Sequence, residues 1–300
     1  MFSQRFGRLI TAMVTPFCEA DLSIDNQALE KLIEHLIKNN TTSLLITGTT
    51  GENPTLTHAE ETQLLRTCKS IIKGRIPIIF GAGSNCTKTC IEASKNAMEN
   101  GADAIMLVSP YYNKPSQDGM FCHFSEVAKE VDLPIILYNN PGRTSSYIQA
   151  TTIAKLHEKH KNIQAIKESR SDNCLDTLTQ LQIIVPNFEI YSGDDSLIIP
   201  VLGLGGVGIV SVASHVVGSQ MKILIEKFFS GDFTEAAKDF NKLYPLFRSL
   251  FASPSPGPIK YLLSELKICS SKVRLPLTEP PDSIKQSLKE IFSEVARIKL

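Results

Sequence analysis

Several side chains that can carry out chemistry follow short apolar runs in this sequence. Lys167 comes directly after the run 163–166, Tyr138 follows the run 134–137, and Arg143 comes shortly after that tyrosine. An amine is a potential nucleophile, a phenol can transfer protons, and a guanidinium suits bidentate binding of a carboxylate. If the apolar runs are strands of one sheet, these groups gather at one rim of the fold.

Each of these residues also has a structural explanation when it is taken alone. Lys167 suits a solvated strand end, and Tyr138 suits core packing with a partner for its hydroxyl. The threonine pair Thr49-Thr50 suits a turn, and Asp194 suits a helix N-cap. The coincidence of a lysine, two tyrosines (Tyr112 and Tyr138), a threonine pair and an arginine favours a catalytic site instead.

The elements that must position these groups alternate along the chain. Apolar strand candidates are followed by segments of helical periodicity, and strands that are apolar throughout suit a parallel sheet covered on both faces. Eight repeats of this unit predict an α/β fold of the (β/α)8 TIM-barrel type, whose functional groups gather at the C-terminal strand ends. The predicted strands are Leu9–Thr15, Ser43–Thr47, Pro77–Gly81, Ala104–Val108, Pro134–Asn139, Ile163–Lys167, Phe188–Ser192 and Gly208–Val212.

The strand pattern stops near residue 220. We therefore expect a catalytic barrel over residues 1–222 and a helical region over 223–300 that packs on it. The helices expected in that region are Met221–Ser230, Thr234–Phe251, Ile259–Cys269 and Ile284–Ile298.

Composition excludes several classes of function. Lys plus Arg and Asp plus Glu both number 31, so the net charge is zero and nothing indicates nucleic acid or an anionic membrane as a partner. The first residues have no long apolar stretch, which predicts no signal peptide, and no apolar run is long enough for a membrane span. The seven cysteines form no CxxC pair and are expected to be reduced thiols of a cytoplasmic protein.

Six short motifs in order make the sequence resemble one known family, the dihydrodipicolinate synthase/N-acetylneuraminate lyase family of class I aldolase-like barrels. The resemblance spans nearly the whole chain. The motifs are GTTGE (48–52), PYYNKPSQ (110–117), YNNPGRT (138–144), AIKES (165–169), SGDD (192–195) and GVGIVSV (206–212).

The resemblance implies a reaction through a Schiff base on Lys167. Pyruvate would condense with L-aspartate 4-semialdehyde to give 4-hydroxy-tetrahydrodipicolinate, an intermediate of diaminopimelate and lysine biosynthesis. A Schiff base needs a neutral amine, and desolvation at an apolar barrel mouth favours the neutral form of a lysine. The Schiff base itself supplies the electron sink, and no HExxH or paired-histidine motif occurs, so we expect neither a cofactor nor a metal.

The family also implies roles for the other residues. Tyr138 would be the general acid/base, and Thr50 would link it to Tyr112, which reaches in from a neighbouring subunit of a homotetramer. Thr50, with Thr49 beside it, would hold the pyruvate carboxylate, and Arg143 would clamp the carboxylate of the semialdehyde. The backbone at Gly193 and Val210 would line the pocket.

Three positions choose between members of the family. Thr49, Tyr112 and Arg143 match the synthases, whereas sialic acid lyases have serine at the first position and lack the tyrosine and the arginine. A sugar-acid aldolase is the alternative within the class. Arg170-Ser171 and His215 depart from the usual synthase pattern and could alter the edge of the pocket.

Two further readings come from other classes. Residues 203–208 fit the GxGxxG pattern of dinucleotide-binding oxidoreductases, but a helix is expected before them and a strand after them, the reverse of the required order. A catalytically silent barrel that serves as a scaffold or small-acid sensor is the other alternative. The intact set Thr50, Tyr112, Tyr138, Arg143 and Lys167 argues against it.

Overall fold

The computed structural model describes residues 5–169 and 174–296. In this part of the chain eight strands follow one another in a closed parallel barrel, in chain order. All eight predicted strands are confirmed, with ends that differ by a few residues. They are β1 (Leu9–Ala12), β2 (Ser43–Ile46), β3 (Ile78–Gly81), β4 (Ala104–Val108), β5 (Ile135–Asn139), β6 (Ile163–Glu168), β7 (Glu189–Ser192) and β8 (Gly208–Ser211).

Helices connect the strands, as the βα alternation predicts. Those up to β8 are α1 (Asn26–Lys38), α2 (His58–Ile72), α3 (Thr87–Glu99), α4 (Gln117–Glu130), α5 (Pro141–Thr144), α6 (Ala150–Lys159), α7 (Cys174–Ile184) and α8 (Ile198–Gly203). Those after β8 are α9 (Ser214–Phe229), α10 (Phe233–Ser249), α11 (Gly257–Glu265) and α12 (Asp282–Ala296).

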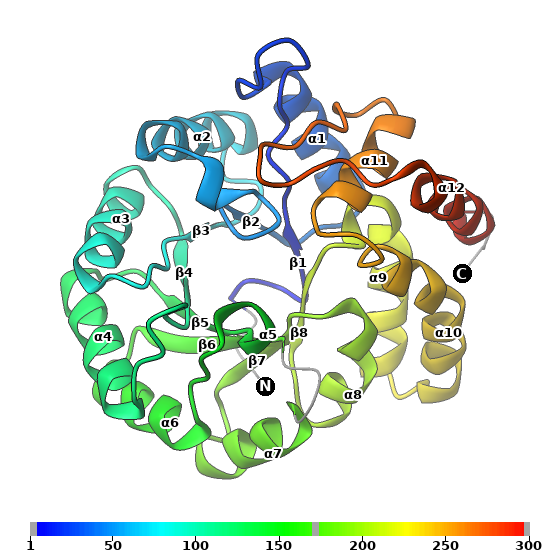
Figure 1. Cartoon of the computed structure of the whole chain (residues 1–300). Coiled ribbons are helices and arrows are strands. Elements are labelled where there is room, and N and C mark those ends of the chain that lie inside the picture. The colour runs from blue at the N-terminus through cyan, green and yellow to red at the C-terminus, as the bar shows by residue number, and fades with distance from the viewer. Residues whose placement is uncertain (1–4, 170–173, 297–300) are drawn as a thin grey trace. The chain divides into compact units, whose positions relative to one another are not determined.

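The chain divides into two compact units, and the first comprises Pro77–Val210 with the N-terminal residues up to Phe6. Its strands pair in parallel from β3 to β8. Figure 1 shows α3, α4, α6 and α7 in chain order on the outer side of these strands. The short helix α5, which the sequence pattern did not predict, directly follows β5.

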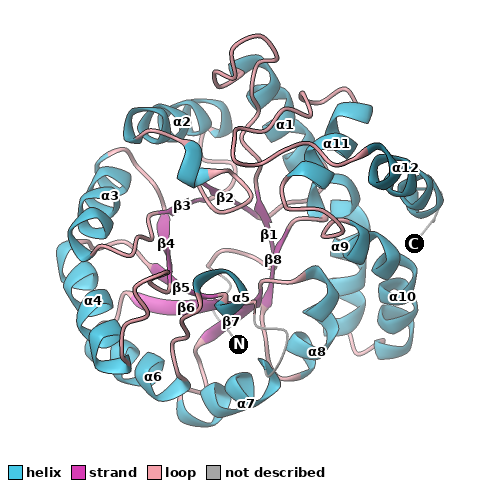
Figure 2. Cartoon of the chain, in the orientation of Figure 1, coloured by secondary structure: helices cyan, strands magenta, loops and turns pink. Residues whose placement is uncertain are grey.

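The second unit comprises Gly7–Ile76 and Ser211–Leu300. In this unit β1 pairs with β2, α1 packs on α2, and α9 packs on β1. The C-terminal helices α9, α10 and α12 pack on one another in that order, and Figure 2 shows them side by side. The predicted division into a barrel over 1–222 and a helical region over 223–300 has other boundaries than these two units, and it stays a prediction.

Local chemistry explains where several helices begin. Thr57 accepts a hydrogen bond from the backbone N–H of Glu60 while the Glu60 side chain accepts from that of Thr57, and this capping box starts α2. Asp194 accepts from the backbone N–H of Ser196 and caps the 3₁₀ turn Asp195–Leu197, as predicted.

One helix begins earlier than the sequence pattern indicates. Helix α9 starts at Ser214 rather than Met221 and contains a non-helical residue, Val217. A Cβ on the next residue, Gly218, would lie 2.4 Å from the carbonyl oxygen of Asn39, so only glycine permits this close approach. Tertiary packing thus carries the helix through Val216-Val217-Gly218, whose β-branched and glycine residues have low helix propensity.

No helix among the described residues combines the length and the apolar character that a membrane span requires.

His215 is a fully buried histidine of the second unit, and its ring is bound on both sides by backbone. Its Nδ1 lies 2.8 Å from the carbonyl oxygen of Val212, and its Nε2 accepts a hydrogen bond of 3.2 Å from the N–H of Val14. This pair of partners requires the neutral Nδ1–H form. Burial lowers the pKa of His215 to about 4.

We therefore expect His215 to make the free energy of unfolding depend on pH. The unfolded histidine takes up a proton below about pH 6.5, whereas the folded one does so only near pH 4. Stability is thus complete above the unfolded pKa and is lost as pH falls toward 4. In urea unfolding between pH 7 and 4, the variant His215→Gln should lose about 3 kcal/mol less than the wild type. If the free energy of unfolding fell by the same amount with pH in both proteins, this prediction would be wrong.

Candidate active site

The first unit brings a lysine and a tyrosine together at adjacent strand ends. Tyr138 of β5 is in register with Lys167 of β6, and both side chains are buried, with 5% and 7% exposed. The Nζ of Lys167 lies 4.3 Å from the centroid of the Tyr138 ring. Two predicted site residues from different motifs are therefore direct neighbours in an interior environment.

Electrostatics at Tyr138 oppose the effect of burial. Burial by itself raises the pKa of a phenol, because it disfavours the charged form. The positive charge of Lys167, the hydrogen bond from Asn140 and the positive charge of Arg143 more than offset this, so the pKa of Tyr138 lies below its ordinary value. The environment therefore favours a phenol that can give up its proton.

Gly193 adjoins the lysine from the end of β7. A Cβ at this position would lie 1.9 Å from Ser169 Oγ and 2.8 Å from Lys167 Cε, well inside normal contact distances. Its backbone N–H donates to the carbonyl oxygen of Glu168 at 2.7 Å. Glycine at 193 is therefore required by the path of the Lys167 side chain. Val210, the other lining residue implied by the resemblance, is buried in β8.

Arg143 is exposed, on the single-turn helix α5 that follows β5. The turn begins with Pro141, whose fixed φ suits a first helical position, and it is capped by the Asn140 side chain. Arg143 is therefore held at the rim by its backbone while its guanidinium is accessible from solvent.

Tyr112 lies in a loop of the same unit and is 89% exposed. Its φ of 72° falls in the left-handed region that a bulky residue rarely adopts. The loop is attached to α5, because the Tyr112 N–H donates to the carbonyl oxygen of Thr144, and the Ser109 hydroxyl donates to Thr144 Oγ1 at 3.1 Å. The described chain thus presents an aromatic hydroxyl to solvent from a constrained backbone.

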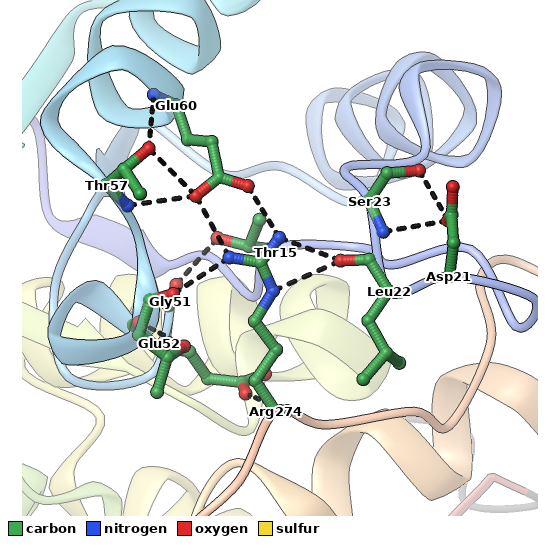
Figure 3. A network of polar contacts seen from close by, with 10 residues as sticks. Thr15, Asp21, Leu22, Ser23, Gly51, Glu52, Thr57, Glu60 and Arg274 are labelled. Atoms are coloured by element: carbon green, nitrogen blue, oxygen red, sulfur yellow. Dashed lines mark hydrogen bonds and ion pairs between the residues drawn. The ribbon is translucent and has the colours of Figure 1, made fainter.

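The threonine pair belongs to the second unit. Thr50 is buried and Thr49 half-buried, in a turn closed by hydrogen bonds from the Gly51 and Glu52 N–H groups to the carbonyl oxygens of Gly48 and Thr49. The Thr15 hydroxyl donates to the carbonyl oxygen of Gly51 at 2.7 Å (Figure 3). Hydrogen bonds on both sides of the turn therefore fix the threonine backbone.

Glu52 connects this turn to the C-terminal part of the same unit. Its carboxylate lies 2.5 Å from the Lys260 ammonium, and both side chains are completely buried. It also accepts a 2.9 Å hydrogen bond from the backbone N–H of Arg274, whose guanidinium binds Glu60 and the carbonyl oxygen of Leu22 (Figure 3). Breaking a buried pair of this kind typically costs about 3–5 kcal/mol, so the turn has little freedom to move.

Sequence reasoning did not single out Lys260 or Arg274. A signal for Lys260 was available, since it stands between apolar residues of a predicted helix and a lysine on a buried face needs a charged partner. The partner itself, more than two hundred residues away, had no local signal. Asn140 was likewise noted only as part of a motif, although asparagine before Pro141 marks a helix start.

Two departures from the synthase pattern have different outcomes. His215 is buried with both ring nitrogens engaged by backbone groups. Arg170 and Ser171 lie outside the described residues. Residues 203–208 run from the last residue of α8 to the first residue of β8, a helix before and a strand after as predicted, which excludes the Rossmann arrangement.

Among the described residues, no group of three or more His, Cys, Asp or Glu side chains is arranged to hold a metal ion. What the first unit offers is an amine, a phenol with a lowered pKa and a guanidinium at neighbouring strand ends. The chain is therefore a (β/α)8-barrel protein. It has a buried lysine–tyrosine pair at the ends of β6 and β5.

Comparisons with known proteins specify the family. The profile of the Dihydrodipicolinate synthetase family matches residues 5–295. The chain is 43% identical to the 4-hydroxy-tetrahydrodipicolinate synthase of Oceanobacillus iheyensis, over 98% of this chain and 99% of that protein. The chain belongs to the dihydrodipicolinate synthetase family.

The chain is also similar to solved structures of dihydrodipicolinate synthases. A dihydrodipicolinate synthase from Bacillus anthracis has a TM-score of 0.93 at 42% identity and covers 100% of both chains. The enzyme from Cyanidioschyzon merolae has a TM-score of 0.94 at 41% identity, covering 98% of this chain and 99% of that one.

The contact between Gly193 and the lysine gives a prediction. In Gly193→Ala the added methyl group would lie 2.8 Å from Lys167 Cε and 2.9 Å from its Cγ, so the lysine side chain must shift. We expect kcat/KM to fall at least about 100-fold, as is usual for an ångström-scale misplacement of a reacting group. Gly203→Ala is the matched control, since a Cβ there meets nothing within 4 Å. Equal activities of the two variants would show that Lys167 tolerates the methyl group.

Proposed function

We infer that the chain condenses pyruvate with L-aspartate 4-semialdehyde to 4-hydroxy-tetrahydrodipicolinate, the reaction after which its relatives are named. Membership of the family over nearly the whole chain carries this conclusion. The buried Lys167–Tyr138 pair supplies the chemistry that such a reaction requires. The chain thereby belongs in the biosynthesis of diaminopimelate and lysine.

The reaction begins with Lys167. Its neutral amine attacks the ketone carbon of pyruvate, and the adduct loses water to give an iminium ion. Loss of a proton from the methyl group turns the iminium into an enamine, whose terminal carbon is the nucleophile. That carbon forms a bond to the aldehyde carbon of the semialdehyde, and the aldehyde oxygen takes up a proton. The amino group of the semialdehyde then attacks the iminium carbon, closes the ring and releases Lys167 as a free amine.

Each step moves a proton, and Tyr138 is the group placed to move it. The phenol is next to the Lys167 amine, and its lowered pKa makes its ionised form a better-populated proton acceptor. The lysine nitrogen carries a positive charge in the ammonium and in the iminium, so the attraction that favours the phenolate acts at those two stages, and it is absent in the neutral amine and the enamine. Tyr138 is accordingly the general acid/base of the proposed mechanism.

The remaining residues bind and orient the substrates. Thr50, with Thr49 beside it, holds the pyruvate carboxylate, and their fixed backbone suits a task that needs no rearrangement. Arg143 clamps the carboxylate of the semialdehyde with its accessible guanidinium. Gly193 and Val210 line the pocket. A sugar-acid aldolase is less well supported, since Thr49, Tyr112 and Arg143 all match the synthases.

We place the enzyme in the cytoplasm. Cys18, Cys68, Cys86, Cys90, Cys122 and Cys269 are free thiols, which is typical of a reducing compartment. No cofactor is needed, because the Schiff base performs the activation.

We also propose that the enzyme is a homotetramer, a dimer of dimers in which Tyr112 enters the site of a neighbouring subunit. Two observations support this: the side chain is almost fully exposed, and its backbone has a conformation that isolated loops avoid. A strained, exposed aromatic residue suits an interface better than it suits solvent. There its hydroxyl would connect to Tyr138 through Thr50.

Covalent trapping tests the proposed function. Wild-type enzyme incubated with pyruvate and borohydride should gain one reduced pyruvyl adduct on Lys167, detected by peptide mass spectrometry, and lose activity. Lys167→Ala should gain none, whereas the exposed control Lys155→Ala should behave as wild type. In a coupled assay with both substrates, wild type should turn over and Lys167→Ala should not. An adduct on Lys167 with activity only toward another aldehyde would point to the sugar-acid aldolase instead.

Complementation between subunits tests the placement of Tyr112. The variants Tyr112→Phe and Lys167→Ala should each have low activity alone. When the two are unfolded together and refolded, a mixed oligomer contains a site with Lys167 from one chain and Tyr112 from the other, so activity should return. If Tyr112 served its own chain, mixing would restore nothing. Sedimentation of the wild type should show a tetramer.

A further inference from the structure

Asn140 lies on the short segment of the first unit that joins β5 to α5. It follows the last residue of β5 and precedes α5, with φ −149° and ψ 76°, and its side chain is half-buried. The carboxamide is thus positioned between Tyr138, two residues before it, and Arg143, three residues after it.

Both ends of this carboxamide have partners. The Nδ2 group donates a 2.9 Å hydrogen bond to the phenol oxygen of Tyr138, and Oδ1 accepts a 3.2 Å hydrogen bond from the backbone N–H of Arg143. The Arg143 N–H can only donate, so it requires the oxygen end of the amide and leaves the NH₂ end for the phenol. The two contacts therefore fix the orientation of the amide.

We propose that Asn140 is a positioning residue of the proposed reaction, which holds the phenol of Tyr138 as a hydrogen-bond acceptor with one end of its amide and the Arg143 turn with the other. This inference rests on the proposed function, in which Tyr138 moves protons and Arg143 binds the second substrate. One neutral side chain thereby sets the distance between the proton carrier and the carboxylate clamp.

The hydrogen bond to the phenol also has a chemical consequence. A donor directed at the oxygen stabilises the phenolate more than the neutral phenol. The charged groups that act on Tyr138 are Lys167 from β6 and Arg143 from α5, both cations. Asn140 supplies a hydrogen-bond donor to the phenol, and it also belongs to the turn carrying Arg143.

The two roles of Asn140 can be separated by substitution. The α5 turn has a second support, because the Asn140 carbonyl oxygen accepts from the N–H groups of Arg143 and Thr144 at 3.0 Å and from the Thr144 hydroxyl. Asn140→Ser and Asn140→Asp each keep a side-chain oxygen that can cap the turn but lose the N–H donor. Asn140→Asp further replaces the donor with a negative charge.

The experiment measures ionisation of the phenol and the pH dependence of the reaction. An ultraviolet difference titration of the enzyme without substrate should contain a tyrosine step that is absent from Tyr138→Phe. We expect this step to move up by about one pH unit in Asn140→Ser and by more in Asn140→Asp. The acidic limb of kcat/KM should move in the same direction by a similar amount, while KM for the semialdehyde changes less than about threefold.

A second helix cap provides the control for a merely structural effect. Asp232→Ala removes the N-cap of α10, far from these residues in sequence, and should leave both the tyrosine step and the limb in place. If Asn140→Ser and Asn140→Asp retain the wild-type melting temperature and both pH curves coincide with wild type, the proposal is wrong, whatever the loss of turnover. The titration needs no substrate, so its result stands apart from the borohydride test of the proposed function.

Discussion

The register between β5 and β6 is the constraint on which the site depends. It sets Tyr138 opposite Lys167, and a shift of one residue would turn one of the two side chains to the other face of the sheet. The register in turn depends on strands that are buried on both faces, where every displaced side chain would cost apolar contacts. The distance between the Lys167 amine and the Tyr138 ring is thus determined by core packing rather than by the two polar groups themselves.

Within that geometry, burial and charge act on the same phenol in opposite directions. The interior disfavours the phenolate, and the two cations with the Asn140 donor favour it. Because the interior screens charges weakly, the outcome depends on a few well-placed groups rather than on the surrounding solvent. Small features, such as the missing Cβ of Gly193 and the orientation of one amide, therefore shape the surroundings of Lys167 and Tyr138.

In the second unit a buried ion pair fixes the position of the Gly48–Glu52 turn. The Gly48–Glu52 turn carries two threonines with short, neutral side chains that cannot anchor it, and Glu52 does so through Lys260 and the backbone of Arg274. Both partners come from the C-terminal part of the chain. The C-terminal segment of the second unit therefore fixes the position of the turn and also covers apolar helices. An exposed ion pair would hold the turn less firmly, because water would weaken the attraction between the charges.

The sequence by itself determined the class of fold, because the periodicity of its apolar residues indicates which segments are strands and which are amphipathic helices. It also indicated Lys167, Tyr138, Arg143 and the threonine pair, since strand ends of such a barrel converge. Only the tertiary structure decided what these residues touch: the ring of Tyr138 against Lys167, the amide of Asn140, the absent Cβ of Gly193, and the ion pair of Glu52 with Lys260. Periodicity reports which face of an element is buried, whereas contacts between distant segments depend on register and packing, which no local pattern encodes.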